Sequence, residues 1–221
     1  MSDVLARDYD VFNHIDELDL ANEPLVICDV DEVILHFIAP LEAYIARNGF
    51  ELIEPRFKLT GNIRATGDGA MASQDDVRGL IHGFFEEETE EQQPVAHAAD
   101  ALAALAPHAQ IVMLTNMPER FRPAREKTLR SHTIDFPVLT NIGPKGPAVA
   151  KLAEKTDAPV FFLDDSEINV ASVRDHVSHA HLIRFIADER FFALAEPVEG
   201  VHLQSNCWQD TRRYIEGVLK A

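Results

Sequence analysis

The sequence has few cysteines and no long hydrophobic run. Its two cysteines, Cys28 and Cys207, are too few for a disulfide framework and lack the spacing of metal ligands. No apolar stretch reaches the ~20 residues that a transmembrane helix needs. The first residues are rich in Asp and Glu, whereas an export signal begins with a basic segment followed by an apolar one. These absences predict a cytoplasmic protein in a reducing compartment, without a membrane partner.

Basic residues are also scarce. The chain has 20 Lys and Arg against 37 Asp and Glu, a formal net charge of −17. Such a charge repels polyphosphate backbones and anionic membrane surfaces, so we expect no nucleic acid polymer as a partner. A small phosphorylated metabolite remains compatible, because a divalent cation and a few fixed positive groups can reverse the field locally. A homo-oligomer is compatible with the sequence as well.

The 221 residues suffice for one full-sized core with one insertion. From residue 95 onward, short apolar segments alternate with amphipathic ones, which is typical of right-handed βαβ crossovers and a parallel sheet covered on both faces. The expected strands are 111–114, 137–139, 160–163 and 181–185. The expected helices are 95–105, 119–131, 148–155, 168–176 and a closing helix at 208–219. The fold class is therefore α/β, a Rossmann-like doubly wound parallel sheet.

Residues 1–36 and 95–221 are expected to form this core, and residues 37–94 an inserted, mostly helical cap. In the cap, a helix over 41–48 should end at Gly49, followed by an irregular glycine-containing stretch over 60–69 and a short helix near 77–82. The acidic run over 86–91 reads as a solvated helix face. Before the first strand, apolar residues three or four positions apart predict an amphipathic helix; they are Leu5, Tyr9, Phe12, Ile15 and Leu18.

The most informative segment is the apolar run 25–34, which contains Asp29 and Asp31. The run reads as a strand buried on both faces, and residues two apart in a strand project to the same side. The two carboxylates should then lie side by side. Like charges at that distance require a cation such as Mg²⁺ or a proton on one member. Taken alone, the pattern is equally typical of acids in a solvated loop.

Polar side chains follow the other strands too. Thr115 and Asn116 come after the strand at 111–114, and Asp164 and Asp165 after the strand at 160–163. Lys145 precedes a helix in the segment between them. Ligands of open α/β sheets bind beyond the carboxyl ends of the strands, so these side chains are expected to share one site.

This set of motifs resembles the haloacid dehalogenase (HAD) superfamily: a DxD pair, a Ser or Thr after the second strand, a Lys and an acidic pair, in that order. The resemblance implies a Mg²⁺-dependent phosphomonoester hydrolase with a cap inserted after the first strand, similar to phosphoglycolate phosphatases or 5'-deoxynucleotidases of the superfamily. One position departs from the pattern: the residue after the second aspartate is often Gly in the superfamily and is Glu32 here.

The resemblance also implies roles for these residues. Asp29 would attack phosphorus and form an aspartyl-phosphate. Asp31 would protonate the leaving oxygen and then activate water, which requires it to begin protonated. The hydroxyl of Thr115 and the backbone N–H of Asn116 would bind phosphate oxygens at the start of a helix, with Pro118 its first residue, and Lys145 would neutralise phosphate and nucleophile. These roles make Asp29, Asp31, Thr115 and Lys145 the expected catalytic residues.

The implied metal is Mg²⁺, a hard cation that prefers oxygen ligands. It would take the carboxylates of Asp29 and Asp164 and the backbone carbonyl of Asp31. Asp165, the fourth acid of the site, and Asn169 would orient these ligands through water.

Two further groups have weaker signals. Arg56, Lys58 and Arg64 are the basic residues of the central part of the cap, where an arginine could bind a distal anionic group of the substrate, although a solvated surface position is the favoured explanation for each. The histidines at 176, 179 and 181 lack the spacing of a metal-binding helix and read as surface or helix-end residues.

Three rival functions were weighed. A 2-haloacid dehalogenase shares the fold, but it lacks an acid in the position of Asp31. A phosphoacceptor receiver module also combines acids, Thr and Lys, but its acidic pair follows the first strand and it has no cap. A catalytically silent HAD-fold protein that acts by binding alone stays open at the level of sequence.

Overall fold

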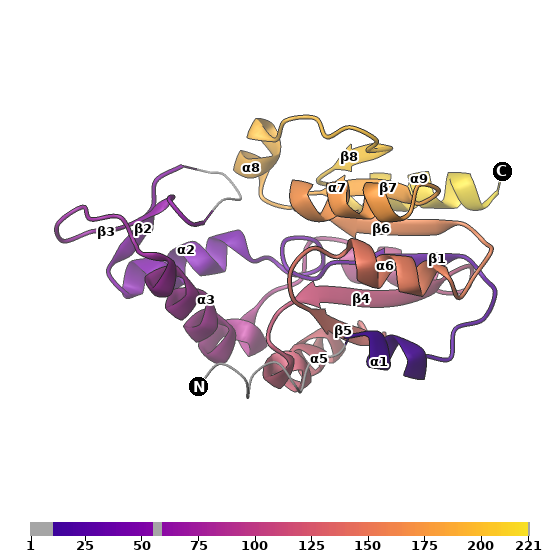
Figure 1. The fold of residues 1–221 in the computed structure, drawn as a ribbon, viewed down its shortest axis with the longest axis horizontal. Helices are drawn as coiled ribbons and strands as arrows, with labels where there is room; N and C mark the ends of the chain where they lie inside the picture. The colour runs from indigo at the N-terminus through magenta and orange to yellow at the C-terminus, as the bar shows by residue number, and fades with distance from the viewer. Residues whose placement is uncertain (1–10, 55–58, 221) are drawn as a thin grey trace.

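The computed structural model describes residues 11–54 and 59–220. Its centre is a six-stranded parallel sheet in the order β5-β4-β1-β6-β7-β8 (Figure 1). The strands are β1 (Leu25–Cys28), β4 (Gln110–Asn116), β5 (Val138–Asn141), β6 (Val160–Asp164), β7 (His181–Phe185) and β8 (Leu203–Ser205). This arrangement confirms the predicted α/β, Rossmann-like fold.

Helices cover both faces of the sheet because its strands are apolar on both sides. All four residues of β1 are fully buried. Val26 and Cys28 pack in one core cluster, and Leu25 and Ile27 in a second one on the other face. The first cluster includes residues of α4 (Ala98–Leu105), α5 (Arg122–Ser131) and α9 (Trp208–Leu219). The second includes residues of α1 (Val11–Glu17), α6 (Gly146–Ala153) and α7 (Glu167–His176), which lie on the near face in Figure 1.

Between β1 and β4 the chain leaves the sheet and forms a separate group of elements beyond the carboxyl ends of the strands (Figure 1). We call this group the insertion; its elements are α2 (Ile38–Arg47), β2 (Phe50–Leu52), β3 (Ile63–Ala65), α3 (Gln74–Glu88) and the 3₁₀ turn η1 (Thr89–Glu91). Its two connections to the core pair with each other, since His36 N–H donates to the Gln93 carbonyl at 2.9 Å and Val95 N–H to the Ile34 carbonyl at 2.8 Å.

The insertion differs from the expectation in two places. The segment 60–69, expected to be irregular, contains β3, which pairs antiparallel with β2. The helix expected near 77–82 extends over Gln74–Glu88, because Ser73 and Asp76 form a capping box at its start and the acidic run continues it. The helix before Gly49 is confirmed, and Gly49 adopts φ +80°, the left-handed conformation that ends it.

The core also contains elements that were not predicted, namely α8 (Glu189–Leu194) and β8. The helix predicted over 119–131 begins with a 3₁₀ turn, η2 (Glu119–Phe121), before α5. Of the predicted N-terminal helix, α1 contains Phe12 and the fully buried Ile15, whereas Leu5 and Tyr9 lie outside the described residues. No helix in the described ranges combines the length and apolar character needed to cross a membrane.

Candidate active site

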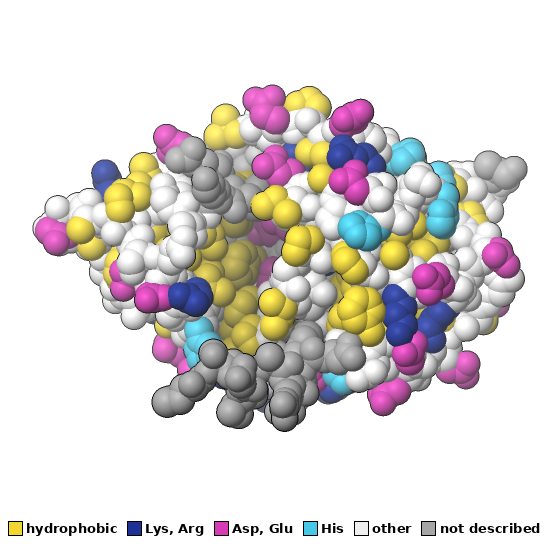
Figure 2. All heavy atoms as spheres, in the orientation of Figure 1, with side chains coloured by type: hydrophobic (Ala, Val, Ile, Leu, Met, Phe, Trp, Pro, Cys, Tyr) yellow, Lys and Arg dark blue, Asp and Glu magenta, His cyan; other side chains and the backbone are white. Residues whose placement is uncertain are grey.

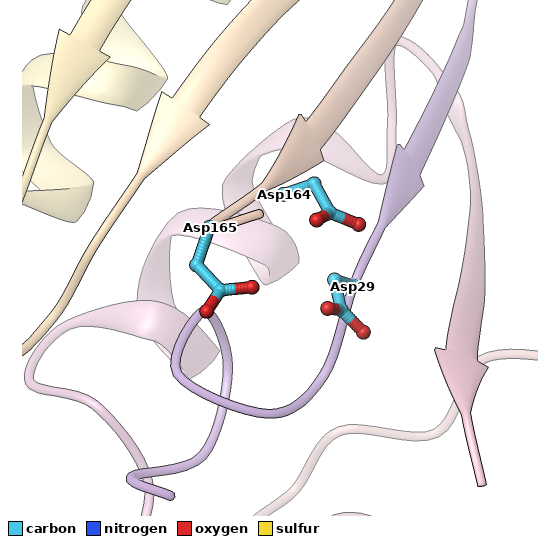
Figure 3. Close-up of side chains that lie close together, drawn as sticks. All are labelled: Asp29, Asp164 and Asp165. Atoms are coloured by element: carbon cyan, nitrogen blue, oxygen red, sulfur yellow. The ribbon is translucent and has the colours of Figure 1, made fainter. Parts of the chain in front are cut away.

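Three carboxylates converge where two neighbouring strands end. Asp29 follows β1 directly, Asp164 is the last residue of β6, and Asp165 comes next. β1 and β6 are paired in parallel, and the Asp29 N–H continues the pairing by donating to the Leu163 carbonyl at 2.8 Å. One oxygen of each carboxylate lies within 4.8 Å of the others (Figure 3). The predicted convergence of these three acids is therefore present.

Lys145 lies among these acids and is fully buried. Its Nζ is 2.8 Å from Asp29 Oδ1 and 2.7 Å from Asp164 Oδ2. Burial by itself would lower the pKa of Lys145, but the ion pairs with Asp164 and Asp29 outweigh it and raise that pKa. The ammonium is therefore charged at neutral pH, as predicted for the lysine before α6.

The acids remain in excess of this one cation. Burial raises the pKa of Asp29 to about 7; Lys145 opposes the shift, and Asp164 and Asp31 add to it. Burial, followed by the charges of Asp164 and Asp29, raises the pKa of Asp165 well above its usual range. The raised pKa values of Asp29 and Asp165 show that this group of three acids is short of positive charge, and carboxylate oxygens so close together suit a hard divalent cation. The three acids could therefore hold a metal ion.

Two side chains fix the acidic pair. Asn169, in the first turn of α7, donates from Nδ2 to both oxygens of Asp164 at 3.0 and 3.2 Å. Asn169 was predicted to act through water, whereas in the structure it hydrogen-bonds Asp164 directly. Arg184 of β7 is buried and donates to the backbone carbonyls of Asp165 at 3.2 Å and Glu196 at 2.6 Å. Arg184 was not predicted, although a cation within an apolar strand is a signal that could have identified it.

Asp31 occupies a different place from the one expected. β1 ends at Cys28, and the chain then turns through Glu32 at φ +64°, so the two-residue period of a strand does not extend to Asp31. Its carboxylate accepts hydrogen bonds from Arg125 Nη2 at 2.8 and 3.0 Å and from Gln92 Nε2 at 3.0 Å. Asp31 is therefore not one of the three clustered acids, although its charge contributes to the raised pKa of Asp29.

The two partners of Asp31 were not predicted. Arg125, on α5, is fully buried, and its Nε and Nη1 have no hydrogen-bond partner among the described atoms. Nothing in the sequence separates it from its neighbours Arg122 and Arg130, because α5 is polar along its length. Gln92 also donates to the His36 carbonyl at 3.0 Å. The Asp31 carboxylate is thus hydrogen-bonded to a side chain of the insertion's return connection.

Glu32 stands at the position where the superfamily often has Gly, and its backbone and carboxylate show how a glutamate fits there. A positive φ is the conformation that Gly adopts without strain, and Glu32 adopts it at φ +64°. The buried carboxylate accepts from the N–H groups of Phe37 at 3.0 Å and Ile38 at 2.8 Å, so it caps the first turn of α2. Burial raises the pKa of Glu32, and these hydrogen bonds oppose the shift.

Thr115 and Asn116 end β4 beside β1. The Thr115 hydroxyl is buried and has no hydrogen-bond partner among the described atoms. The side chain of Asn116 is engaged: Nδ2 donates to the Gly143 carbonyl at 3.0 Å, and Oδ1 accepts from Asn141 at 2.8 Å. The helix predicted to start at Pro118 instead follows η2, so these residues precede a 3₁₀ turn rather than the start of an α-helix.

The cap arginine considered for substrate binding is elsewhere. Arg64 lies on β3, at the outer end of the insertion in Figure 1, and its half-exposed side chain pairs with Glu51 at 2.6 Å. The structure does not bring Arg64 to the acids, because the hairpin directs it to the surface. Arg56 and Lys58 lie outside the described residues.

The histidines do not form a common site. His176 Nδ1 contacts the Ser172 carbonyl at 2.8 Å within α7, and His181 Nδ1 contacts the Tyr214 hydroxyl at 3.0 Å. His181 also stacks on Phe161, with ring centroids 5.1 Å apart. These contacts are those of structural side chains.

Comparison with known proteins identifies the fold. No protein-family model and no curated protein sequence matches the chain. Among solved structures, a haloacid dehalogenase-like protein of unknown function from Agrobacterium tumefaciens matches with a TM-score of 0.60 and 14% identity, covering 87% of this chain and 97% of that one. The L-2-haloacid dehalogenase of Xanthobacter autotrophicus matches with a TM-score of 0.58 and 12% identity, covering 90% and 99%.

A Bacillus subtilis protein described as a HAD-hydrolase, its structure determined with bound magnesium, matches with a TM-score of 0.57 and 14% identity, covering 88% of this chain and 99% of that one. The sheet order and the acids at the strand ends define an α/β protein with its site at the carboxyl edge. The chain has the haloacid dehalogenase-like fold. At these identities the likeness establishes the fold, and the activity has to be argued from the site residues.

Proposed function

We propose that the chain is a Mg²⁺-dependent phosphomonoester hydrolase that acts on a small phosphorylated metabolite. The observation that carries the proposal is the cluster of Asp29, Asp164 and Asp165 around a single buried lysine, Lys145. Such a site is short of positive charge and rich in oxygen donors, which suits a divalent cation together with a phosphate group. When bound, Mg²⁺ would neutralise the acids and polarise a phosphoryl oxygen.

In the first half of the reaction, a carboxylate oxygen of Asp29 attacks phosphorus. A bond from Asp29 to phosphorus forms, the bond from phosphorus to the alcohol oxygen breaks, and the alcohol leaves with a proton that Asp31 donates. Lys145, 2.8 Å from Asp29, holds the nucleophile in place and offsets the charge of the phosphate. The unpartnered hydroxyl of Thr115 is free to donate to a phosphate oxygen.

In the second half, water attacks phosphorus, the bond to Asp29 breaks and phosphate leaves. Having given its proton to the alcohol in the first half, Asp31 accepts a proton from the attacking water, and Arg125, 2.8 Å away, holds its carboxylate in place. To protonate the leaving oxygen in the first half, Asp31 has to leave this ion pair. The presence of an acid here also favours phosphate chemistry over carbon–halogen cleavage, in which no leaving oxygen is protonated.

The substitution Asp31→Asn is expected to lower kcat by about 10²- to 10⁴-fold, the usual contribution of a general acid–base group. The loss should be larger for an alkyl phosphate than for 4-nitrophenyl phosphate, because a strongly basic leaving oxygen depends more on protonation. Steady-state kinetics with the two esters measures the difference. Asp75→Asn, which changes an exposed acid paired with Arg78, is the control. Equal losses for both esters would remove Asp31 from the proton transfer to the leaving group.

The stability of the metal-free protein is expected to depend on pH in a defined direction. Because folding raises the pKa of Asp29 from 3.8 to about 7, the folded state binds this proton more tightly than the unfolded state does. The contribution of Asp29 to stability should therefore be greatest below about pH 4 and fall as the pH rises toward 7, by on the order of 4 kcal/mol for a shift of this size.

A cation that binds the ionised acids offsets this loss, so the rise in Tm on adding Mg²⁺ should grow between pH 4.5 and 7.5. Thermal unfolding with EDTA or with Mg²⁺ across this range is the measurement. Asp29→Asn should flatten the dependence. A Mg²⁺ effect of equal size at both ends of the range would contradict the buried acid cluster as the metal site.

The function itself is tested by assaying purified protein against a panel of phosphate monoesters with and without Mg²⁺. We expect phosphate release from at least one ester that stops in EDTA and returns with Mg²⁺. Phosphate release that is indifferent to the metal, or none from any ester, would contradict the proposal.

In the proposed function the insertion acts as a cap over the substrate.

A further inference from the structure

The carboxyl edge of the sheet opens into a hollow between the insertion and the core. Figure 2 shows that hydrophobic side chains line this hollow and that acidic side chains are visible inside it. The apolar residues at this boundary belong to one cluster that combines the insertion with the segment after β4; Phe84 and Phe85 come from α3, and Met117 and Phe121 follow Asn116. The hollow is thus continuous with the proposed phosphate site.

Aromatic rings of this cluster reach the residues of the site. The Phe85 ring centroid is 5.9 Å from the guanidinium carbon of Arg125, which holds Asp31. Phe37, whose N–H is bound by Glu32, lies 5.2 Å from Phe84 and 6.2 Å from Phe85 between ring centroids. Phe37 is only half-buried, and it also packs against the core cluster that contains Ile186 and Phe191. Phe37 therefore contacts both the insertion and the core, the two sides of the hollow.

In the described part of the insertion, residues 37–54 and 59–94, no arginine is left unpaired to bind a second anionic group of the substrate. The arginines of this part each pair with an acid at the surface: Arg47 with Glu88, Arg64 with Glu51, and Arg78 with Asp75. The end of α3 and η1 add exposed acids. A substrate with a carboxylate or a second phosphate on its leaving group would meet these acids, and the described arginines of the insertion are already paired.

We propose that the leaving group of the substrate is uncharged and apolar, an alkyl or aryl group that fills this hollow, and that Phe37 determines this preference. The proposal rests on the proposed phosphatase function. Burial of an apolar group against the aromatic cluster favours binding roughly in proportion to the area removed from water. Phe37 packs edge to face on the fully buried Phe84 and is itself only half-buried, so its ring is the part of this pair that offers such a surface.

The test is a homologous series of n-alkyl phosphates from methyl to hexyl, with ω-carboxyalkyl phosphates of the same lengths. The basicity of the leaving oxygen changes little along the alkyl series, so a trend in kcat/KM reports contact with the chain and not the chemical step. We expect kcat/KM to rise by about fourfold per buried methylene until the hollow is filled. The carboxylated esters should be poorer substrates than the alkyl esters of equal length.

Phe37→Thr and Ile81→Thr, which change two half-buried residues of the cluster, should each reduce the slope of the series. Two variants are used because either one could fail to fold, which circular dichroism would show. The control is Phe136→Ala. Phe136 is also half-buried, but it lies just before β5, at the amino end of that strand and away from the hollow. The slope of the series for Phe136→Ala should equal that of the wild type.

A rising series that both cluster variants flatten supports the proposal. A flat series, or a preference for the carboxylated esters, would overturn it while leaving the phosphatase function intact. A rising series that neither variant changes would show that the preference arises elsewhere and would overturn the assignment to this hollow. Absence of Mg²⁺-dependent release from every ester would overturn the function and the preference together.

Discussion

Asp29→Asn is expected to reduce Mg²⁺-dependent phosphate release by about 10⁴-fold or more, because the amide cannot attack phosphorus. The fold should persist. Asp29 is 7% exposed and lies against Asp164 and Asp165, so removing its charge relieves repulsion among buried acids. In the absence of metal the variant should be at least as stable as the wild type at pH 7, which thermal unfolding measures.

The matched control is Asp16→Asn, since Asp16 is an exposed acid whose only assigned role is a surface pair with Lys151 at 2.6 Å. Its activity should remain within about twofold of the wild type, as expected for a weak surface pair. Undiminished Mg²⁺-dependent turnover by Asp29→Asn would remove Asp29 from the role of nucleophile. Lost turnover together with lost structure would show that Asp29 is needed for folding instead.

Lys145→Met is expected to lower both stability and activity. The ammonium is the one cation within hydrogen-bond distance of Asp29 and Asp164 among the described residues, and all three groups are buried. Removing one partner of a buried ion pair costs about 3–5 kcal/mol, because the remaining charges are left without compensation. Denaturant unfolding in EDTA measures this loss, and kcat should fall by about 10²- to 10³-fold through lost stabilisation of the phosphoryl charge.

Lys151→Met is the control, because Lys151 pairs with Asp16 near the surface and such pairs contribute at most about 1 kcal/mol. Part of the stability lost by Lys145→Met should return in Mg²⁺, since a bound cation replaces the missing charge. If Lys145→Met and Lys151→Met destabilised the protein equally, the electrostatic account of the site would be contradicted.

The sheet and the meeting of three acids were predictable because they depend on few assumptions. An apolar strand followed by Asp29 and another followed by Asp164 and Asp165 end at the same edge of a parallel sheet, wherever the connections run. Lys145 was predictable for the same reason, since it lies between the end of β5 and the start of α6, and the helices of a parallel sheet start at that edge. These expectations concern which residues meet, and the structure places all four together.

The orientation of Asp31 was not predictable, because it depends on where β1 stops. The apolar run predicts a strand as far as residue 34, whereas the pairing ends at Cys28 and a turn through Glu32 redirects the chain. Its partner Arg125 belongs to a helix full of charged residues, and which of them is buried depends on tertiary contacts, here with Asp31 and with Phe85 of α3. The hairpin β2–β3 was missed because each strand has three residues, too few for an alternating pattern.

The central claim is that Asp29 becomes covalently phosphorylated during turnover. The most direct measurement is to mix enzyme, Mg²⁺ and an active ester, quench with acid within milliseconds, and examine the peptide that contains Asp29 by mass spectrometry. We predict one added phosphoryl group on that peptide, lost on treatment with hydroxylamine, and absent in Asp29→Asn and in EDTA. Rapid phosphate release with no phosphorylated peptide at any quench time, or with the group on another residue, would contradict the account.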